Sequence, residues 1–224
     1  MRALRPLRAL RYTDAAIERY GNTLLARGAE PPGDLAERPP VSAARLRFPE
    51  RRPDDRSKYV QYARTSAAME QGRREHELAL TGVGYGWVWG ESPALLGLAA
   101  LDDLPSAPAA APDDARLRLL EATWAQLEPI VLAVPALPDE STSGEEWTLD
   151  GWRVRWSAED PAVTLEHATL ARGQETLAAA RRFREERGAV RTPRPDDDVL
   201  VALVPAAAAD QLPTGLAFYS LRDA

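Results

Sequence analysis

The alternation of large and small side chains is most regular in the stretch TGVGYGWVWGES (81–92). A period of two residues is typical of a strand, so this stretch is predicted to be one. One of its faces would carry the large side chains Val83, Tyr85, Trp87 and Trp89. The other face would be nearly bare, with Gly82, Gly84, Gly86 and Val88.

A second period-two pattern, EEWTLDGWRVRW (145–156), predicts a β-hairpin rich in tryptophan. Asp150-Gly151 suits a two-residue type I′ turn, in which both central residues have φ > 0. Folding about this turn pairs Leu149 with Trp152 and Trp147 with Val154. One face of the hairpin is then apolar, and the other carries charged and polar side chains.

The remaining patterns predict packed helices and further strands. Helical spacing is seen at 14–27, 57–71, 113–128 and 174–187, with Ser57 as an N-cap and Gly188 as a left-handed C-terminal cap. Strands are predicted at 3–12 (an edge strand that tolerates Pro6), 130–134, 199–204 and 215–221. The stretch 162–171 fits a third meander strand after the hairpin or the start of a long helix, and its β-branched residues favour the strand. The apolar stretch 92–101 fits either a helix or a strand. Helices and strands do not alternate regularly, so we predict an α+β fold with a mixed, mostly antiparallel sheet.

Three stretches rich in Pro, Gly and Asp predict loops: 28–40, 102–114 and 188–198. The middle one is the best boundary between two parts of the chain. We therefore expect a basic N-terminal half (1–104) and an acidic C-terminal half (105–224), packed as one compact unit.

The composition excludes several kinds of chemistry and indicates the class of protein. The 224-residue chain has no cysteine, which excludes disulfides, thiolate zinc sites and a cysteine nucleophile. Lys58 is the single lysine among 28 basic residues, a bias that indicates a GC-rich bacterial genome. The basic N-terminus is not followed by the apolar run of a secretory signal, and no stretch has the length of a membrane span. A cytoplasmic protein without membrane contact or cofactor is expected.

The net charge of −6 is distributed unevenly. Residues 1–74 hold 16 basic and 9 acidic groups, a net +7, and residues 75–224 hold 12 and 25, a net −13. This division predicts either a region that faces an anion or two regions that attract each other, within one fold or across a homo-oligomer.

The basic region contains a candidate surface for a polyanion. The run RRPDDRSKYVQYAR (51–64), followed by Arg73-Arg74, mixes arginine with tyrosine, as grooves for single-stranded nucleic acid do. The alternative is a helix that buries its tyrosines and exposes its arginines. The candidate contact residues are Arg51, Arg52, Arg56, Lys58, Tyr59, Tyr62, Arg64, Arg73 and Arg74, with Gly84 and Gly86 of the glycine-rich strand.

The glycine-rich strand does not match a phosphate-binding motif. In a dinucleotide fingerprint the third glycine would stand where this chain has Trp87, and no Gly-Lys-Ser/Thr follows for a P-loop. A strand that is bare on one side lets another backbone, a helix or a ligand approach closely. Its aromatic face is more typical of a core than of a platform for bases.

An enzyme is the alternative hypothesis. Glu75-His76-Glu77 and Glu166-His167 place imidazoles beside carboxylates, so His76, Glu75 and His167 are the candidate acid–base residues for a phosphate-containing or small polar substrate. Adjacent side chains diverge in helices and strands, so Glu75-His76-Glu77 alone is a poor metal site, but acid–base or metal chemistry that combines the two distant histidines stays open. Asp196-Asp197-Asp198 precedes a buried strand and reads as a polar turn, with a magnesium site as the alternative.

The scarcity of catalytic constellations favours a non-catalytic binding or assembly module. Its arginine-rich N-terminal third would contact nucleic acid or an acidic protein partner, alone or as a subunit of a larger assembly.

Overall fold

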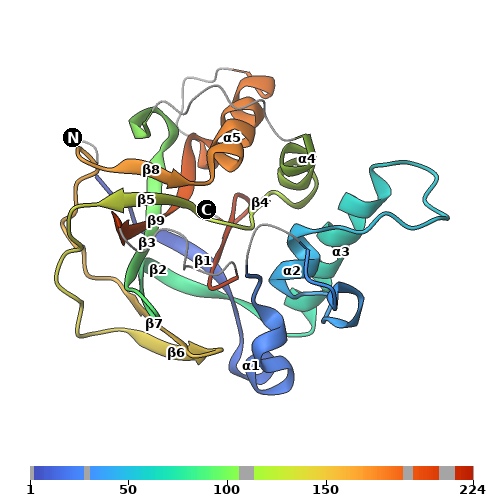
Figure 1. The fold of residues 1–224 in the computed structure, drawn as a ribbon, viewed down its shortest axis with the longest axis horizontal. Coiled ribbons are helices and arrows are strands. Elements are labelled where there is room, and N and C mark those ends of the chain that lie inside the picture. The colour runs from blue at the N-terminus through green and yellow to red at the C-terminus, as the bar shows by residue number, and fades with distance from the viewer. Residues whose placement is uncertain (1–2, 28–30, 106–113, 189–193, 207–214, 224) are drawn as a thin grey trace.

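The computed structural model describes residues 3–27, 31–105, 114–188, 194–206 and 215–223. Within these ranges the chain forms five α-helices, four 3-10 helices and ten strands (Figure 1). The α-helices are α1 (Asp14–Tyr20), α2 (Ala43–Arg47), α3 (Val60–Arg74), α4 (Asp114–Thr123) and α5 (Gln174–Glu186). The 3-10 helices are η1 (Gly21–Leu24), η2 (Leu35–Glu37), η3 (Leu101–Asp103) and η4 (Pro195–Asp197). The strands are β1 (Leu7–Tyr12), β2 (Leu78–Trp89), β3 (Ala94–Ala100), β4 (Ala125–Gln126), β5 (Ile130–Val134), β6 (Glu145–Leu149), β7 (Trp152–Ser157), β8 (Thr169–Arg172), β9 (Asp198–Pro205) and β10 (Phe218–Ser220).

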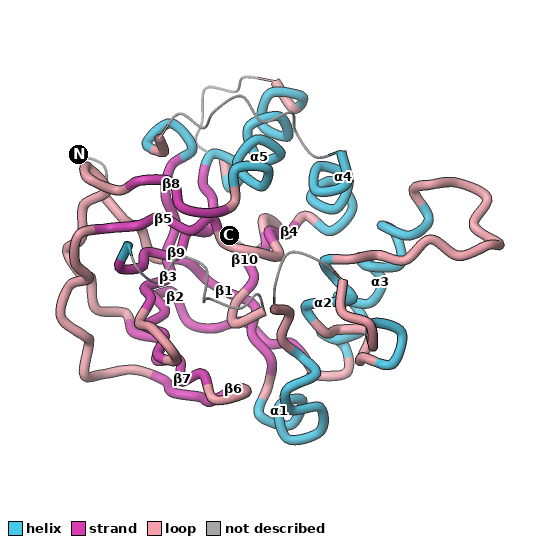
Figure 2. Tube along the Cα trace, in the orientation of Figure 1, coloured by secondary structure: helices cyan, strands magenta, loops and turns pink. Residues whose placement is uncertain are grey.

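The ten strands form one mixed sheet in the order β4-β10-β1-β2-β3-β9-β5-β8, with β7 paired to β2 and β6 to β7. The pair β5–β9 is parallel and the other strand pairs in the described residues are antiparallel. The helices lie at the periphery of the sheet (Figure 2). The predicted α+β class is confirmed, and strands from both halves of the chain share the sheet.

Strand β9, in the middle of the sheet, is buried on both faces. Val199, Val201 and Leu203 belong to one apolar cluster, and Leu200 and Ala202 belong to the other. Burial on both sides explains why this strand is a continuous apolar run instead of an alternating one. Helices α4 and α5 pack against each other beside this part of the sheet (Figure 1).

Strand β2 changes partners along its length. Its first part pairs with β1, and its last part pairs with β3 on one edge and β7 on the other. The backbone of Arg5 forms an isolated antiparallel β-bridge with Leu98 of β3, and Leu7 is paired with Gly84 of β2. The start of the chain therefore enters between β2 and β3 where these two strands separate.

The β6–β7 hairpin has the register expected from its turn. Leu149 is opposite Trp152 and Trp147 is opposite Val154. Asp150 and Gly151 have φ of 50° and 79°, as a type I′ turn requires.

The prediction of an edge strand near the N-terminus was wrong. β1 is an interior strand between β10 and β2, and it starts at Leu7, one residue after Pro6. Proline therefore lies outside the strand and removes no donor from either ladder.

Two predicted helices are shorter than expected because single residues take left-handed backbone angles. α1 ends at Tyr20, since Gly21 has φ of 52° and its N–H donates to the carbonyl of Ile17. α4 ends at Thr123, since Trp124 has φ of 53°, so the helix stops before Pro129 is reached. α3 starts at Val60, later than the predicted cap at Ser57, whose hydroxyl accepts from the N–H of Tyr59.

The strand predicted at 162–171 is mostly loop. Only Thr169–Arg172 forms a strand, and it pairs with β5 rather than with the hairpin. None of the helices in the described ranges has the combination of length and apolarity that crossing a membrane requires.

Candidate functional site

At Gly84 and Gly86 the bare face of β2 is covered by Trp156 and Ser157 of the neighbouring strand, whereas Gly82 is exposed. The ring Nε1–H of Trp156 donates to the carbonyl of Gly82 at 2.9 Å. A Cβ on Gly84 would lie 2.3 Å from the carbonyl oxygen of Ser157, and one on Gly86 would lie 2.7 Å from the six-membered ring of Trp156. The glycines thus let an aromatic ring and a strand approach the backbone of β2, and the space beside Gly84 and Gly86 is occupied by protein.

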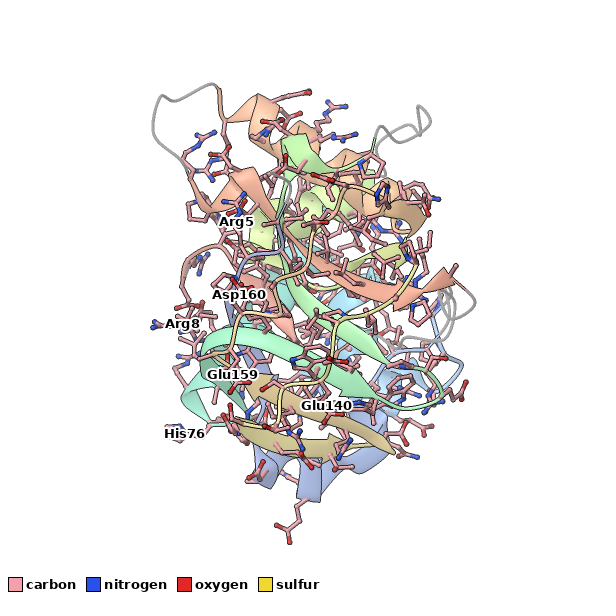
Figure 3. The ribbon with its side chains drawn as sticks, turned by 90° about the vertical axis from the view of Figure 1, so that its left-hand side faces the viewer. Arg5, Arg8, His76, Glu140, Glu159 and Asp160 are labelled. Atoms are coloured by element: carbon pink, nitrogen blue, oxygen red, sulfur yellow. The ribbon has the colours of Figure 1, made fainter. Side chains whose placement is uncertain are left out.

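His76 has a structural explanation at the end of α3. It has φ of 57°, and the N–H of Glu77 donates to the carbonyl of Gly72 while that of His76 donates to Arg73. This pair of hydrogen bonds is the Schellman motif, in which the residue that His76 occupies must be left-handed. The side chain of His76 is exposed and points away from the body (Figure 3).

The other candidate acid–base residues do not gather around His76. Glu75 is exposed and accepts from the side-chain amide of Gln71 at 2.7 Å. His167 is exposed in the turn before β8, which is separated in the sheet from β2 by β3, β9 and β5. In the part of the chain that the structure describes, no three metal-ligating side chains are grouped for an ion.

The carboxylates of Asp196 to Asp198 are tied to nearby arginines and backbone. Asp196, with a side chain 2% exposed, lies 3.3 Å from Arg194 and 3.5 Å from Arg187. Asp197 accepts from the N–H of Arg194, and burial raises the pKa of Asp198, which is paired with Arg5. These contacts are those of a polar turn that closes the chain before β9.

The segment 49–59, which we call the basic arm, joins α2 to α3 and projects from the body (Figure 1). Arg51, Arg52 and Arg56 are exposed on it. Among the described residues, none of these three side chains has a carboxylate within ion-pair distance.

Arg64 of α3 holds the basic arm in shape. Its guanidinium donates to both carboxylate oxygens of Asp55, at 2.5 and 2.8 Å, and to the carbonyl of Glu50 at 2.6 Å. Asp55 also accepts from the N–H of Arg52 at 2.8 Å. The hydrogen bond from Arg64 is the main reason that the pKa of Asp55 is lowered to about 2.

The two predicted tyrosines differ in exposure. Tyr62 is buried against the core, whereas Tyr59 is 49% exposed at the base of the basic arm. Cations of Lys58 and Arg118 lie 5.3 and 5.7 Å from the ring centre of Tyr59. The structure therefore offers one tyrosine ring, not two, to a partner.

The two arginines at the end of α3 also differ. Arg73 donates to both carboxylate oxygens of Asp223, at 2.8 and 3.1 Å, and so links the helix to the C-terminal segment. Arg74 is exposed, with no ion pair in the described ranges. Arg73 is part of the fold, and Arg74 is accessible.

An open groove of about 240 Å³ lies between the base of the basic arm and α3. Three arginines line it, Arg45, Arg52 and Arg64, against one carboxylate, that of Glu50. We call it the arginine groove. Its lining favours an anionic group, because Arg45, Arg52 and Arg64 outnumber Glu50 and the Asp55 that pairs with Arg64.

A second hollow, the Glu128 cavity, also has a volume of about 240 Å³ and lies on the other side of Phe48. Two helices line it with residues at helical spacing, which places each set on one face. These are Arg116, Leu119 and Leu120 of α4, and Thr176, Ala179 and Ala180 of α5.

Glu128 is the centre of an ion cluster in this cavity. Its carboxylate accepts from Arg116 Nε at 2.8 Å and from the hydroxyl of Thr176 at 2.8 Å, and it lies 2.7 Å from Arg47 Nε. Arg116 also pairs with Glu175 at 2.7 Å. The side chains of Arg47 and Glu128 are only 12% and 15% exposed.

The pKa values in the cluster reflect burial and charge together. Burial acts to raise the pKa of Glu128, but the charges of Arg47 and Arg116 outweigh it, so the pKa lies below its ordinary value. Burial is also the main reason that the pKa of Arg47 is lowered. Glu128 is therefore a fixed anion and is poorly suited to exchange protons near neutral pH.

The site residues predicted from the sequence do not include those of the Glu128 cavity. Arg47, Arg116, Glu128 and Thr176 are far apart in the chain, and no motif connects them. One signal was available: Glu128 is a single charge between Leu127 and the apolar strand that follows Pro129. A charge in an apolar run is seldom buried without a partner.

The models of known protein families, the curated proteins and the solved structures contain no match to this chain, so its function has to be inferred from its own residues.

Proposed function

We propose that this protein is a non-catalytic binding module that contacts an acidic segment of a protein partner through the basic arm and the arginine groove. The observation that carries the proposal is a projecting, internally hydrogen-bonded loop with three exposed arginines, Arg51, Arg52 and Arg56. These side chains have no ion pair in the described residues, so their charges are available to a partner.

The order of the basic arm supports a role in binding. The contacts of Arg64 with Asp55 and Glu50 fix the loop before any partner arrives. A preordered loop loses less conformational entropy on association than a flexible one. Arginine and tyrosine, the types that it presents, are enriched among the residues that dominate the energy of protein interfaces.

The same features favour an acidic protein over nucleic acid. Binding of single strands relies on successive exposed rings, and here Tyr62 is buried while Tyr59 already lies between two cations. The rest of the chain, from residue 75 on, carries a net −13 and would repel a long polyanion. A short acidic segment needs to approach only the basic arm.

The test is fluorescence anisotropy of the full chain with two labelled probes, an acidic peptide of alternating Glu and Gly and a single-stranded RNA of similar length. We expect the peptide to bind, and its affinity to fall as salt is raised, because exposed charges are screened over about 8 Å at physiological ionic strength. Reversing Arg51, Arg52 and Arg56 to Glu should abolish peptide binding.

The matched control reverses three arginines elsewhere on the surface, Arg8, Arg182 and Arg222. Each reversal changes the charge by two, so both triple variants go from −6 to −12. The control should keep most of the peptide affinity. An equal loss of peptide affinity in the two variants would show that only net charge matters. Tighter binding of the RNA than of the peptide would favour nucleic acid as the partner. No binding of either probe would contradict the proposal.

A further inference from the structure

We propose that the acidic segment of the partner carries a large apolar side chain next to its acidic residues, and that this side chain binds in an apolar hollow beside the arginine groove. The inference rests on the proposed function, because the hollow would be the second half of the same contact surface.

The hollow, which we call the proline hollow, has a volume of about 510 Å³ and adjoins the arginine groove. Four residues line both of them: Phe48, Pro49, Glu50 and Gln61. A segment whose acidic residues lie in the arginine groove therefore has its neighbouring residues at the mouth of the proline hollow.

Most of the lining is apolar and comes from two parts of the chain. These are the stretch around η2 (Pro31, Pro32 and Leu35) and the stretch from the end of α2 to the start of α3 (Phe48, Pro49 and Tyr62). Proline fixes its own φ, so three of these residues have little conformational freedom to lose on binding.

Two arginines connect the walls of the groove and of the hollow. Arg45, which lines the arginine groove, donates to the carbonyl of Arg38 at 3.1 Å. Arg38 in turn donates to the carbonyl of Leu25 at 2.8 Å and pairs at 2.9 Å with Asp34, the residue before η2. The spacing of the two hollows is thus set before a partner binds, as recognition of two neighbouring side chains requires.

The charged groups in the lining do not favour a second acidic group in the proline hollow. They are Arg47, whose guanidinium lies 2.7 Å from Glu128, and Glu50, which is exposed. An acidic side chain would meet one carboxylate and one arginine that is already paired. An apolar side chain instead gains by leaving water, because it is covered by apolar walls.

Two polar groups in the lining suit the backbone of a bound peptide. The side-chain amide of Gln61 and the hydroxyl of Tyr62 make no hydrogen bond to any residue that the structure describes. Tyr62 is only 9% exposed, and a tyrosine buried to this extent usually has a partner for its hydroxyl. An amide and a hydroxyl can both donate to and accept from peptide groups, which favours a peptide as the occupant.

The test is fluorescence anisotropy of the full chain with the alternating Glu-Gly peptide and with versions that carry Phe at either end of the acidic stretch. Matched versions carry Ser in place of Phe. Burial of the ring should make at least one Phe version bind about tenfold more tightly than its Ser version. Salt should weaken both but leave their ratio unchanged, because ions screen charges and not apolar contacts.

The outcomes separate this inference from the proposed function. If the Glu-Gly peptide binds and neither Phe version binds more tightly than its Ser version, the inference is overturned and the proposed function stands. If none of the peptides binds, both are wrong.

Ala36→Trp tests where the apolar side chain lies. Ala36 is exposed and lines the proline hollow, so the indole should fill the hollow and leave the core intact. The variant should lose the tenfold gain of the Phe version and keep its affinity for the Glu-Gly peptide. Ala158→Trp, at an exposed alanine after β7, is the control and should keep the gain. If Ala36→Trp is folded by thermal unfolding and still shows the full gain, the proposal is wrong.

Gln61→Ala tests the contact to the peptide backbone without filling the hollow. Loss of one hydrogen bond should weaken the Phe and Ser versions alike, by about fivefold. Gln174→Ala, at a half-buried glutamine of α5, is the control and should bind as wild type does. An unchanged affinity in Gln61→Ala would contradict this contact.

Discussion

The glycine-rich face of β2 and the Glu128 cavity contrast in how they are built and in how visible they are in the sequence. The glycines lie within one strand, and Trp156 and the backbone of Ser157 fill the space beside Gly84 and Gly86. The cavity is formed by residues from α2, α4, α5 and the segment after β4, and it remains hollow. The feature with the most conspicuous sequence pattern is therefore packing, whereas the residues that form the cavity share almost no pattern in the sequence.

A run of glycines in a strand therefore indicates that another group packs closely against the backbone, but it does not identify that group. In β2 the neighbours of Gly84 and Gly86 are the indole of Trp156 and the backbone of Ser157, whereas the space beside Gly82 is open. Charged residues can mislead in a different way, because they suggest exposure where the structure buries them. Glu128, Arg47 and Arg116 look like surface residues in sequence, yet together they form a buried cluster.

The largest loss of stability is expected when the ion cluster in the Glu128 cavity is broken. Glu128→Gln removes the carboxylate that neutralises Arg47 and Arg116, and breaking a buried ion pair from one side costs about 3–5 kcal/mol. Chemical denaturation at neutral pH measures this loss. Glu175→Gln is the control, because its side chain is 56% exposed and its loss should cost about 0.5 kcal/mol or less.

The cost of Glu128→Gln should depend on pH. The folded-state pKa of Glu128 is below its ordinary value, so its stabilising contribution is complete above the unfolded pKa and is lost as pH falls through the folded one. The stability difference between wild type and variant should therefore shrink on acidification below about pH 4. A difference that stays constant with pH would contradict the assigned ion cluster.

The next largest loss of stability is expected when a side chain is added to the glycine-rich face of β2. In Gly84→Ala the new methyl group would meet a backbone oxygen of β7, which cannot turn away, so we expect a loss of about 3 kcal/mol. Gly82→Ala is the matched variant in the same strand, where the methyl group meets nothing within 4 Å. Its stability should stay within about 0.5 kcal/mol of wild type, and similar losses at both sites would contradict the packing described.

Local patterns predicted much of the fold, because they depend on neighbouring residues. The period of two at 81–92 and the Asp150-Gly151 turn are of this kind, and both correspond to strands in the structure. The interior position of β1 could not be predicted, since it depends on β10, which is some 200 residues away in the chain. The ion pairs of individual arginines could not be predicted either. Arg73 is bound by Asp223 at the other end of the chain, whereas Arg74 is not.

A smaller effect concerns His76, a candidate acid–base residue in the sequence. Left-handed backbone angles cost an ordinary residue about 1–2 kcal/mol relative to glycine, so His76→Gly should stabilise the fold by about 1 kcal/mol. His76→Ala keeps the unfavourable angle and should leave stability nearly unchanged. Thermal unfolding compares the three proteins, and a loss of stability in His76→Gly would show that the imidazole makes a contact important to the fold.

Binding of the acidic peptide at the basic arm can be mapped residue by residue. Amide NMR spectra of the full chain are recorded while the acidic peptide is added. We expect shifts at Arg51–Tyr59 and around Arg45 and Arg64, with none at Gly82–Trp87. Shifts concentrated on β2, or an unchanged basic arm in the presence of bound peptide, would contradict the proposed contact.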